Sequence, residues 1–404
     1  MAERPAKIIV NEVTGTGSTS MDGFLEVAGN RADVVIANPN SITVNGGGFI
    51  NTGKAFLTTG KPVYDGEDHL QHFDITGGDI LIEGKGLGGK ETGSLAILSR
   101  AVRINAGIWA KDLHITTGAN TVDAKTLEAS AIEGKGGRPA FALDTAAIGG
   151  MYAGRITLVG TEKGLGVNNS GTWSAEDNLT LDWNGDLKNS GTIYSKGNTD
   201  LRASHLENDK TIAAGKDITI SADGHVTNTG TVGAGINEAG GLTETGTLEI
   251  QSRRVDNRQG TLLAGNHLGI SSGSLSNEKG QISGYGTFHT AAEEIDNTDG
   301  KISFIGDVSI KAKDMANDRG RLTTESSLFL RGNTVTNGKG TVIAGGDASL
   351  YGTSFNNIEG NIITGKDMEL VLPWIRNRGG TLSAKGSMNC LLYTSPSPRD
   401  VEES

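Results

Sequence analysis

The stretch Asn257–Gly280 reads NRQGTLLAGNHLGISSGSLSNEKG, and its opening motif Asn-x-x-Gly returns at its end after 20 residues. The same spacing of 20 then continues without a break. The recurring asparagines are Asn257, Asn277, Asn297, Asn317, Asn337, Asn357 and Asn377. The glycines that follow three positions later are Gly260, Gly280, Gly300, Gly320, Gly340, Gly360 and Gly380. A fixed period of this length indicates a solenoid, in which each repeat is one structural unit.

Within each repeat the apolar residues alternate with other residues, as in Leu268-Gly269-Ile270. This two-residue period is that of a β-strand. The Asn-x-x-Gly motifs indicate turns, because Asn and Gly tolerate positive φ. Two or three short strands cannot bury their apolar side chains alone, so successive repeats must stack. We therefore expect an all-β fold, a right-handed parallel β-helix (β-solenoid) with about 20 residues per turn, in which the stacked asparagines form an amide ladder.

The composition excludes several classes of protein. Glycine accounts for 61 of 404 residues, but the 7 prolines are too few for collagen. The net charge of −11 argues against a nucleic-acid partner. No run approaches the roughly 20 apolar residues of a membrane helix. The single cysteine, Cys390, excludes a disulfide scaffold.

The repeat becomes less regular toward the N-terminus. The step from Asn228 to Asn257 is 29 residues, and we predict that the extra nine form a loop near Gly233–Gly241. Residues 161–389 are therefore assigned to β-helix repeats, whereas residues 1–160 keep short apolar strands such as Val34–Ala37 but lose the period.

The period also fails at the C-terminal end. Ser397 and Asp400 stand where Asn and Gly are expected, and Pro396 and Pro398 arrive together with Cys390. We interpret residues 390–404 as a non-native tail.

The N-terminal third carries a series of characteristic segments. They are Ile9–Val13, Gly23–Gly29, Val35–Thr43, Gly48–Thr52, Leu98–Val102, Asn105–Ala110 and Gly160–Val167. Through these segments residues 4–170 resemble the secretion domain of two-partner secretion exoproteins of the filamentous haemagglutinin and haemolysin type. The 20-residue units resemble the haemagglutinin repeats of the same family, including its contact-dependent inhibition members.

The resemblance implies which residues matter for secretion. The candidate secretion-motif residues are Asn11, Glu12, Asn38, Pro39, Asn40 and Ser41. The family motif Asn-Pro-Asn-Gly ends here in Ser41, and Val44 and Gly47 occupy the positions of a cysteine pair found in many relatives. Because the resemblance begins without a signal peptide, we expect an N-terminal fragment of a longer protein.

The resemblance also implies a function. We expect a secreted, rod-like, monomeric protein on the outer surface of a Gram-negative bacterium, exported by an outer-membrane β-barrel partner transporter. Its expected role is adhesion, through a receptor on a host or neighbouring cell. The alternative is the stalk of a contact-dependent growth-inhibition toxin whose toxic C-terminus is absent here. A polysaccharide-active β-helix enzyme is a more distant alternative.

Sequence patterns for catalysis are weak, so we expect neither an enzyme nor a cofactor. Sugar chemistry needs carboxylates converging across turns, and only Asp347 and Asp367 lie on adjacent turns at the most favourable column. We interpret both as turn residues that bond their own backbone. The segment Gly84–Glu91 approaches a phosphate-binding loop, but Glu91 replaces the required hydroxyl.

Candidate metal and sugar sites are equally weak. His69 and His72 lie on a predicted loop without a third ligand, so we expect no metal site. The indole rings that are candidates for stacking on sugars are more simply explained as buried cap or core residues. They belong to Trp173, Trp183 and Trp374.

Overall fold

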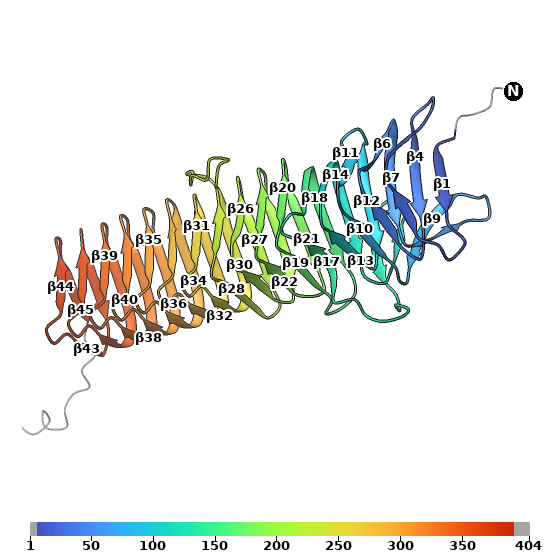
Figure 1. Ribbon diagram of the computed structural model, residues 1–404. Helices are drawn as coiled ribbons and strands as arrows, with labels where there is room; N and C mark the ends of the chain where they lie inside the picture. The colour runs from blue at the N-terminus through green and yellow to red at the C-terminus, as the bar shows by residue number, and fades with distance from the viewer. Residues whose placement is uncertain (1–5, 392–404) are drawn as a thin grey trace, which may run out of the picture. The chain divides into compact units, whose positions relative to one another are not determined.

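The computed structural model describes residues 6–391, which consist of strands, turns and bends; the remainder of the predicted tail, residues 392–404, lies outside the described residues. The described chain contains no helix long and apolar enough to cross a membrane. It divides into two compact units, Met1–Gly224 and His225–Ser404, which we call the N-terminal and the C-terminal unit. In each unit short strands stack turn upon turn in a parallel β-helix (Figure 1). This confirms the predicted fold class.

Each turn of the C-terminal unit visits three faces, which we call A, B and C in chain order. A long strand bends from face A to face B, the Asn-x-x-Gly turn follows, and a short strand forms face C. From β30 (Thr247–Asp256) onward, successive strands of a face pair in parallel at a spacing of 20 residues, so that Leu248 pairs with Leu268 and Leu268 with Phe288. The period seen in the sequence is therefore one turn of the helix.

The strands of this unit follow that plan. The bent strands are β30 (Thr247–Asp256), β32 (His267–Ser276), β34 (Thr287–Asp296), β36 (Val308–Ala316), β38 (Leu328–Thr336) and β40 (Ala348–Asn356). Face B also holds β28 (His225–Asn228) and β43 (Trp374–Arg376), and face A also holds β42 (Met368–Val371) and β45 (Met388–Leu391). Face C consists of β29 (Thr231–Ala234), β31 (Thr261–Ala264), β33 (Gln281–Gly284), β35 (Lys301–Phe304), β37 (Arg321–Thr324), β39 (Thr341–Ala344), β41 (Asn361–Thr364) and β44 (Thr381–Ala384).

The turns between faces B and C differ from the sequence-based expectation in one respect. Positive φ falls not on the repeat glycine but on the residue before it, as in Lys279 (φ 55°) and Arg319 (φ 55°). The glycine is required for another reason. A Cβ at Gly280 would lie 2.2 Å from the carbonyl oxygen of Asn257 in the previous turn. Close stacking of successive turns, rather than the φ angle, therefore selects glycine there.

The predicted loop after Asn228 is confirmed. The chain leaves the helix after β29, and an antiparallel bridge between Ile236 and Leu242 closes the excursion. The helix resumes at β30, where Val255 pairs with Val226.

The N-terminal unit has the same three faces. Face A holds β1 (Ile8–Glu12), β4 (Ala32–Ala37), β7 (Thr52–Thr58), β12 (Ser94–Ser99), β21 (Leu179–Trp183), β24 (Thr199–Ala203) and β27 (Ile218–Ala222). Face B holds β2 (Thr19–Met21), β5 (Ile42–Val44), β10 (Asp79–Ile82), β13 (Ala101–Ile104), β17 (Phe141–Thr145), β19 (Gly166–Asn169), β22 (Leu187–Asn189) and β25 (Leu206–Asn208). Face C holds β3 (Phe24–Glu26), β6 (Gly47–Ile50), β11 (Leu87–Gly89), β20 (Thr172–Ala175), β23 (Thr192–Ser195) and β26 (Thr211–Ala214), and β14 (Gly107–Thr117) and β18 (Gly150–Gly160) run from face C into face A.

Two insertions hide the period in this unit. Between β7 and β10 the chain forms the hairpin of β8 (Lys61–Tyr64) and β9 (Leu70–Ile75). Between β14 and β17 it forms the hairpin of β15 (Asn120–Asp123) and β16 (Ala129–Ala131). The two hairpins pair through β9 and β15 into an antiparallel four-stranded sheet, which the sequence analysis did not foresee.

The antiparallel sheet covers the outer side of face A. Phe56 of face A packs against Phe73 of β9, with ring centroids 5.3 Å apart. The same cluster contains Val35, Ala96 and Val122, all fully buried. Strands that would have one exposed side are thus buried on both sides, which explains the continuous apolar run in β12.

Candidate functional site

The turn Asn38–Ser41 follows β4 and is fastened to the segment before β2. Asn38 is fully buried, and its Nδ2 donates to the carbonyl oxygen of Gly17 at 2.9 Å and to Oγ1 of Thr19 at 2.8 Å. Its Oδ1 accepts from the backbone N–H of Asn40 at 3.0 Å. The side chain of Asn38 therefore determines the course of two adjacent turns of the helix.

The other members of this turn face solvent. Asn40 is exposed, and its Nδ2 donates to the carbonyl oxygens of Gly15 at 3.0 Å and Gly17 at 3.1 Å. Pro39 is also exposed, and Ser41 is half-buried. The turn thus presents a polar surface whose shape depends on a buried amide.

Asn11 and Glu12 lie on β1, one strand away from this turn. They pair with Ile36 and Ala37, the last two residues of β4 before Asn38. The structure therefore brings all six candidate secretion-motif residues to one end of face A, on β1 and on the turn that follows its neighbour β4.

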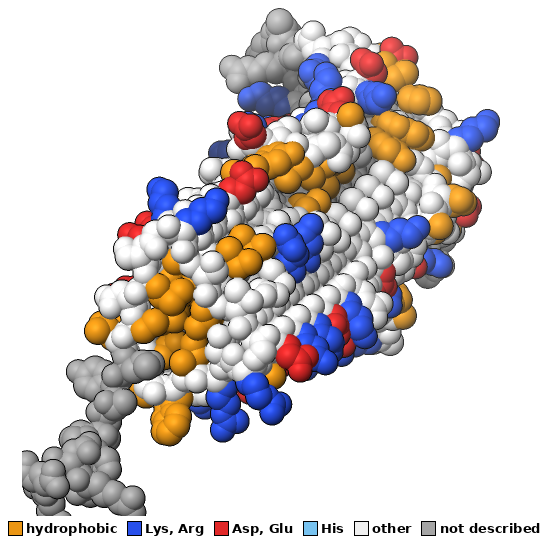
Figure 2. Space-filling view, turned by 90° about the vertical axis from the view of Figure 1, so that its left-hand side faces the viewer, with side chains coloured by type: hydrophobic (Ala, Val, Ile, Leu, Met, Phe, Trp, Pro, Cys, Tyr) orange, Lys and Arg blue, Asp and Glu red, His pale blue; other side chains and the backbone are white. Residues whose placement is uncertain are grey.

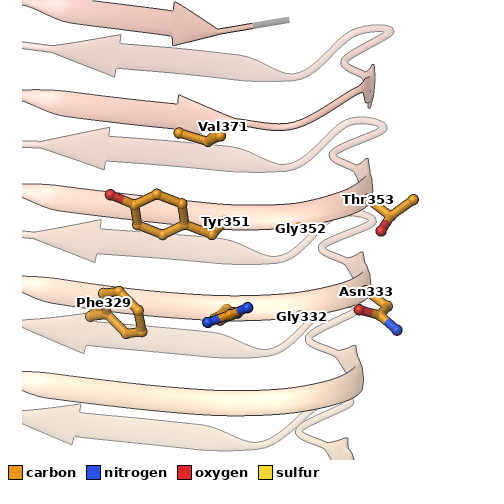
Figure 3. Close-up of a pocket in the computed structure, with 8 residues that line it drawn as sticks. Phe329, Gly332, Asn333, Tyr351, Gly352, Thr353 and Val371 are labelled. Carbon is orange, nitrogen blue, oxygen red and sulfur yellow. The ribbon is translucent and has the colours of Figure 1, made fainter. Parts of the chain in front are cut away.

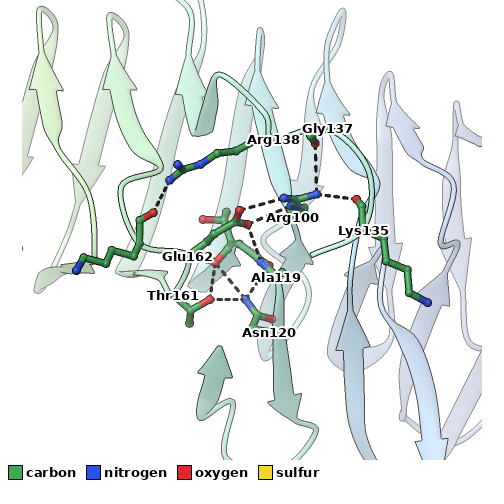
Figure 4. A network of polar contacts seen from close by, with 11 residues as sticks. Arg100, Ala119, Asn120, Lys135, Gly137, Arg138, Thr161 and Glu162 are labelled. Carbon is green, nitrogen blue, oxygen red and sulfur yellow. Dashed lines mark hydrogen bonds and ion pairs between the residues drawn. The ribbon is translucent and has the colours of Figure 1, made fainter. Parts of the chain in front are cut away.

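An ion pair joins two segments at the corner between faces A and B of this unit, after β12 and after β18. Arg100, between β12 and β13, is 6% exposed and makes a two-bond contact with Glu162, with Nε and Nη2 each 3.0 Å from a carboxylate oxygen (Figure 4). The Arg100 Nη1 also donates to the carbonyl oxygen of Lys135 at 2.7 Å. Hydrogen bonding from Arg100 holds the pKa of Glu162 below its ordinary value, and the same bond raises the pKa of Arg100.

Glu162 connects this pair to the second insertion. Its Oε2 accepts from the backbone N–H of Ala119 at 3.1 Å, directly before β15. The next side chain, Asn120, donates to Thr161 Oγ1 at 3.1 Å (Figure 4). Lys135 lies after β16, so the network joins both ends of the inserted hairpin to the helix. The sequence analysis placed Arg100 and Glu162 in matching segments but gave no sign of their contact, since 62 positions separate them.

Face C of the N-terminal unit carries an aromatic slot. Phe24, Gly48, Gly88 and Trp109 occupy the same column on four successive turns. The two rings line a cavity of about 310 Å³ together with Phe49, Gly88, Lys90 and Glu91. Such a slot can hold one apolar or aromatic side chain of a partner.

The repeat asparagines of the C-terminal unit stand one above another. Asn257 Nδ2 donates to Asn277 Oδ1 at 2.7 Å, and the same bond recurs at each step up to Asn377. Each donor also reaches the carbonyl oxygen of the glycine three residues later, as in Asn257 to Gly260 at 3.2 Å. The side chain of the motif asparagine is therefore hydrogen-bonded to the backbone of the motif glycine at the turn between faces B and C.

The carboxylates considered for sugar chemistry accept hydrogen bonds from backbone N–H groups. Asp347 Oδ1 accepts from the N–H of Asp367 at 3.0 Å, and Asp367 Oδ1 accepts from the N–H of Ser387 at 2.7 Å. The expectation that each bonds its own backbone was wrong, because the partner is the N–H one turn later. The hydrogen bonds from the backbone N–H and the hydroxyl of Ser387 lower the pKa of Asp367. A carboxyl group with a lowered pKa is a poor general acid, so Asp367 does not suit that role.

The remaining candidates take structural positions. Gly88 lies in strand β11, and no helix follows Lys90 within the described chain, so the resemblance to a phosphate-binding loop is superficial. His69 lies in a loop as predicted, but His72 belongs to β9. The described residues contain no group of three metal-ligating side chains.

The tryptophans divide into two groups. Trp173 and Trp183 are buried, and the Nε1 of Trp183 donates to the carbonyl oxygen of Leu165 at 2.7 Å. Both are therefore core residues, as predicted. Trp374 is 72% exposed, so the expectation of burial was wrong for this residue.

The surface combines charges of both signs with separate apolar patches. Figure 2 shows basic and acidic side chains alternating along one row, with hydrophobic side chains gathered elsewhere. In the C-terminal unit, charges of opposite sign pair across turns, as Arg319 does with Asp299 at 2.8 Å.

Comparison with known proteins identifies both parts of the chain. A family model of the TPS secretion domain matches residues 2–193. A model of the haemagglutinin repeat matches residues 231–292, 281–352 and 347–389. The crystal structure of a filamentous hemagglutinin secretion domain aligns with a TM-score of 0.41 and 26% identity, over 71% of this chain and 75% of that one.

Three curated relatives illustrate the sequence similarity. The 16S rRNA endonuclease CdiA of Enterobacter cloacae is 44% identical over 54% of this chain and 7% of its own length. The tRNA nuclease CdiA of Yersinia mollaretii is 36% identical over 67% of this chain and 10% of its own length. The tRNA nuclease CdiA of Escherichia coli is 37% identical over 67% of this chain and 9% of its own length. The chain thus spans a tenth or less of these relatives. It belongs to the two-partner secretion exoproteins of the filamentous haemagglutinin type, with a TPS secretion domain followed by haemagglutinin repeats.

Proposed function

We propose that the N-terminal unit directs export of the protein by binding a β-barrel partner transporter in the outer membrane. The observation that carries this proposal is the structure of the turn Asn38–Ser41. Its residues Pro39 and Asn40 are exposed, and the buried side-chain amide of Asn38 holds the turn in place through hydrogen bonds. A buried amide with all its bonds inside the fold gives the exposed residues one fixed arrangement. Recognition of this segment needs no catalysis.

Folding of the β-helix outside the cell can provide the free energy for export, so that no nucleotide hydrolysis is needed. Each turn of a parallel β-helix pairs with the turn before it, so a folded first turn is a template for the next. If the chain crosses the membrane unfolded, folding on the outer side is downhill and opposes return. The cross-turn bonds of Asn38 to Gly17 and Thr19 join the first two turns in this process.

Secretion of the protein, expressed from its own gene together with its transporter, tests the proposal. We expect the double variant Asn38→Ala/Asn40→Ala to lose most of the extracellular protein measured in the culture medium and on cells. The variant Asn333→Ala, an exposed asparagine of the C-terminal unit, is the matched control and should be secreted normally. Normal secretion of the double variant would contradict the proposal.

We further propose that the secreted protein resides at the surface of a Gram-negative cell and mediates adhesion to other cells. The repeats support this role, because stacked turns place a long series of exposed side chains at regular intervals. Purified protein coated on beads should bind host or neighbouring bacterial cells. Beads that bind no cell type tested at concentrations that saturate the coating would argue against adhesion.

A second candidate is the stalk of a contact-dependent growth-inhibition toxin. The names of the relatives, tRNA nuclease CdiA and 16S rRNA endonuclease CdiA, favour it. Competition between a strain that carries the complete gene and a strain that lacks it separates the two candidates. Death of the second strain only on cell contact supports the stalk, and equal growth supports the adhesin.

A further inference from the structure

A groove runs along face A of the C-terminal unit, where the long strands bend toward face B. Its floor consists of small residues at the same position in successive turns. They are Ser272, Ala292, Ala312, Gly332 and Gly352. Two adjoining cavities, of about 470 and 520 Å³, lie above this floor and share Arg331 and Asn333. A column of small side chains over several turns leaves an elongated space of more than about 14 Å.

Aromatic side chains form one wall of the groove. Phe329 and Tyr351 lie on adjacent turns, with ring centroids 5.6 Å apart, and Val371 continues the wall on the next turn (Figure 3). The ring of Tyr351 is held in place because its hydroxyl donates to Glu369 at 2.5 Å. Asn333 and Thr353 stand on the opposite side, at the bend (Figure 3). The groove thus has an apolar wall facing a polar one.

Two basic side chains give the groove its charge. Lys311 and Arg331 are paired positions on adjacent turns, and both line it. Among the described residues, neither has a carboxylate within ion-pairing distance. Glu293 is the one acidic residue that lines the two cavities. In a chain of net charge −11, a groove lined by two adjacent cations and one carboxylate favours an anionic ligand.

The backbone hydrogen bonds at the groove favour a saccharide over a peptide as its ligand. Strands β36, β38 and β40 are each paired on both sides along most of their length, so they offer no free edge to an added peptide strand. A saccharide needs only side-chain donors and a ring to stack on. Tyr351 supplies the ring, Asn333 supplies amide donors, and the Arg331 guanidinium matches a carboxylate in a two-bond geometry.

We propose that this groove binds an anionic oligosaccharide whose carboxylates lie on Arg331 and Lys311 and whose sugar rings stack on Tyr351. The proposal rests on the proposed function in one respect: a protein that adheres to cells would meet such saccharides on their surfaces. Its test is independent of it, because binding of a soluble saccharide requires neither secretion nor cells. If the protein adheres to cells but binds no saccharide, the adhesion proposal stands and the saccharide site is wrong.

Calorimetric titration of the full chain with tetragalacturonate tests the proposal, with a neutral tetragalactan and an acidic peptide as comparisons. We expect tetragalacturonate to bind, Arg331→Ala to weaken binding about tenfold, and Tyr351→Ala to weaken it more than Tyr351→Phe, which keeps the ring but loses the bond to Glu369. Glu293→Gln should bind more tightly, since it removes a like charge from the ligand's neighbourhood. Arg321→Ala, an exposed arginine on face C, is the matched control and should leave the affinity unchanged.

Three results would overturn the site. They are no binding of tetragalacturonate at about 1 mM, equal binding of the neutral tetragalactan, and equal affinity in Arg331→Ala and Arg321→Ala. Binding of the acidic peptide with the same dependence on Arg331 would show that charge alone, and not a saccharide, is recognised. Replacing tetragalacturonate by a sulfated tetrasaccharide without carboxylates distinguishes the two sources of negative charge, and we expect the carboxylate form to bind more tightly.

Discussion

The Nδ2 atom of Asn317 donates a hydrogen bond of 2.7 Å to Oδ1 of Asn337, its equivalent one turn later, and both side chains are at most 1% exposed. Asn317 in turn accepts from Asn297 at 2.6 Å. The amide ladder is therefore a buried polar chain in which each member satisfies two neighbours. Removing Asn317 takes from the Nδ2 of Asn297 its shortest hydrogen bond and from the Oδ1 of Asn337 its side-chain donor.

The variant Asn317→Ala should accordingly destabilise the C-terminal unit by about 3 kcal/mol, since each unsatisfied buried group costs about 1–3 kcal/mol. Chemical unfolding followed by circular dichroism measures the change. The control is Asn333→Ala at an exposed position of the same unit, which should change stability by less than about 0.5 kcal/mol. Equal effects of the two variants would contradict the role given to the ladder.

Thr290 occupies a core column that otherwise holds Ile250, Ile270, Ile310 and Leu330. It is fully buried, and its Oγ1 has no hydrogen-bond partner. Thr290→Val removes the buried hydroxyl without changing the shape of the side chain, so it should stabilise the unit by about 1 kcal/mol. The same unfolding measurement checks it.

Thr324 provides the comparison for that substitution. It is also buried, but its Oγ1 donates to the carbonyl oxygen of Gly306 at 2.5 Å. Thr324→Val should therefore destabilise the unit. Stabilisation by both variants, or by neither, would show that the missing partner is not what distinguishes Thr290.

Arg100→Met should destabilise the N-terminal unit by about 1–3 kcal/mol, because it removes the two-bond contact to the half-buried carboxylate of Glu162. The matched control is Arg103→Met, three positions away. Arg103 pairs with Asp79 on the surface, and its loss should cost less than about 1 kcal/mol. Similar unfolding midpoints for the two variants would contradict the importance of the buried pair.

His114 should make the stability of the N-terminal unit depend on pH. Burial, with a smaller contribution from the charge of Lys54, lowers the pKa of His114 from 6.5 to about 4. The unfolded chain then binds more protons than the folded one between these values, so stability falls as the pH decreases from 6.5 to 4 and this contribution is constant below. The loss amounts to about 3 kcal/mol.

The variant His114→Gln isolates this contribution from the other titrating groups. Unfolding free energies of the natural protein and the variant are compared from pH 7 to pH 4. The natural protein should lose stability relative to the variant across this range. Parallel curves would show that His114 does not titrate as its surroundings imply.

Much of the candidate site could be found in the sequence only as separate pieces. The segments with Asn38 and Asn40 were recognisable by their motif, yet the buried position of one and the exposed position of the other follow from their bonds to Gly15 and Gly17, more than 20 residues away. The same holds for Arg100 and Glu162. A contact between two side chains 62 positions apart leaves no periodic trace in a single sequence.

The sequence by itself determined the β-helix, its 20-residue turn and the stack of asparagines, because each turn repeats the same local pattern and nearest neighbours are equivalent residues. Only the tertiary structure decided that the two insertions meet in an antiparallel sheet over face A. It alone decided that the small residues from Ser272 to Gly352 open a groove beside Arg331. The physical reason is that a repeat encodes contacts at one fixed separation, whereas insertions and surface grooves depend on what the folded turns bring together from different separations.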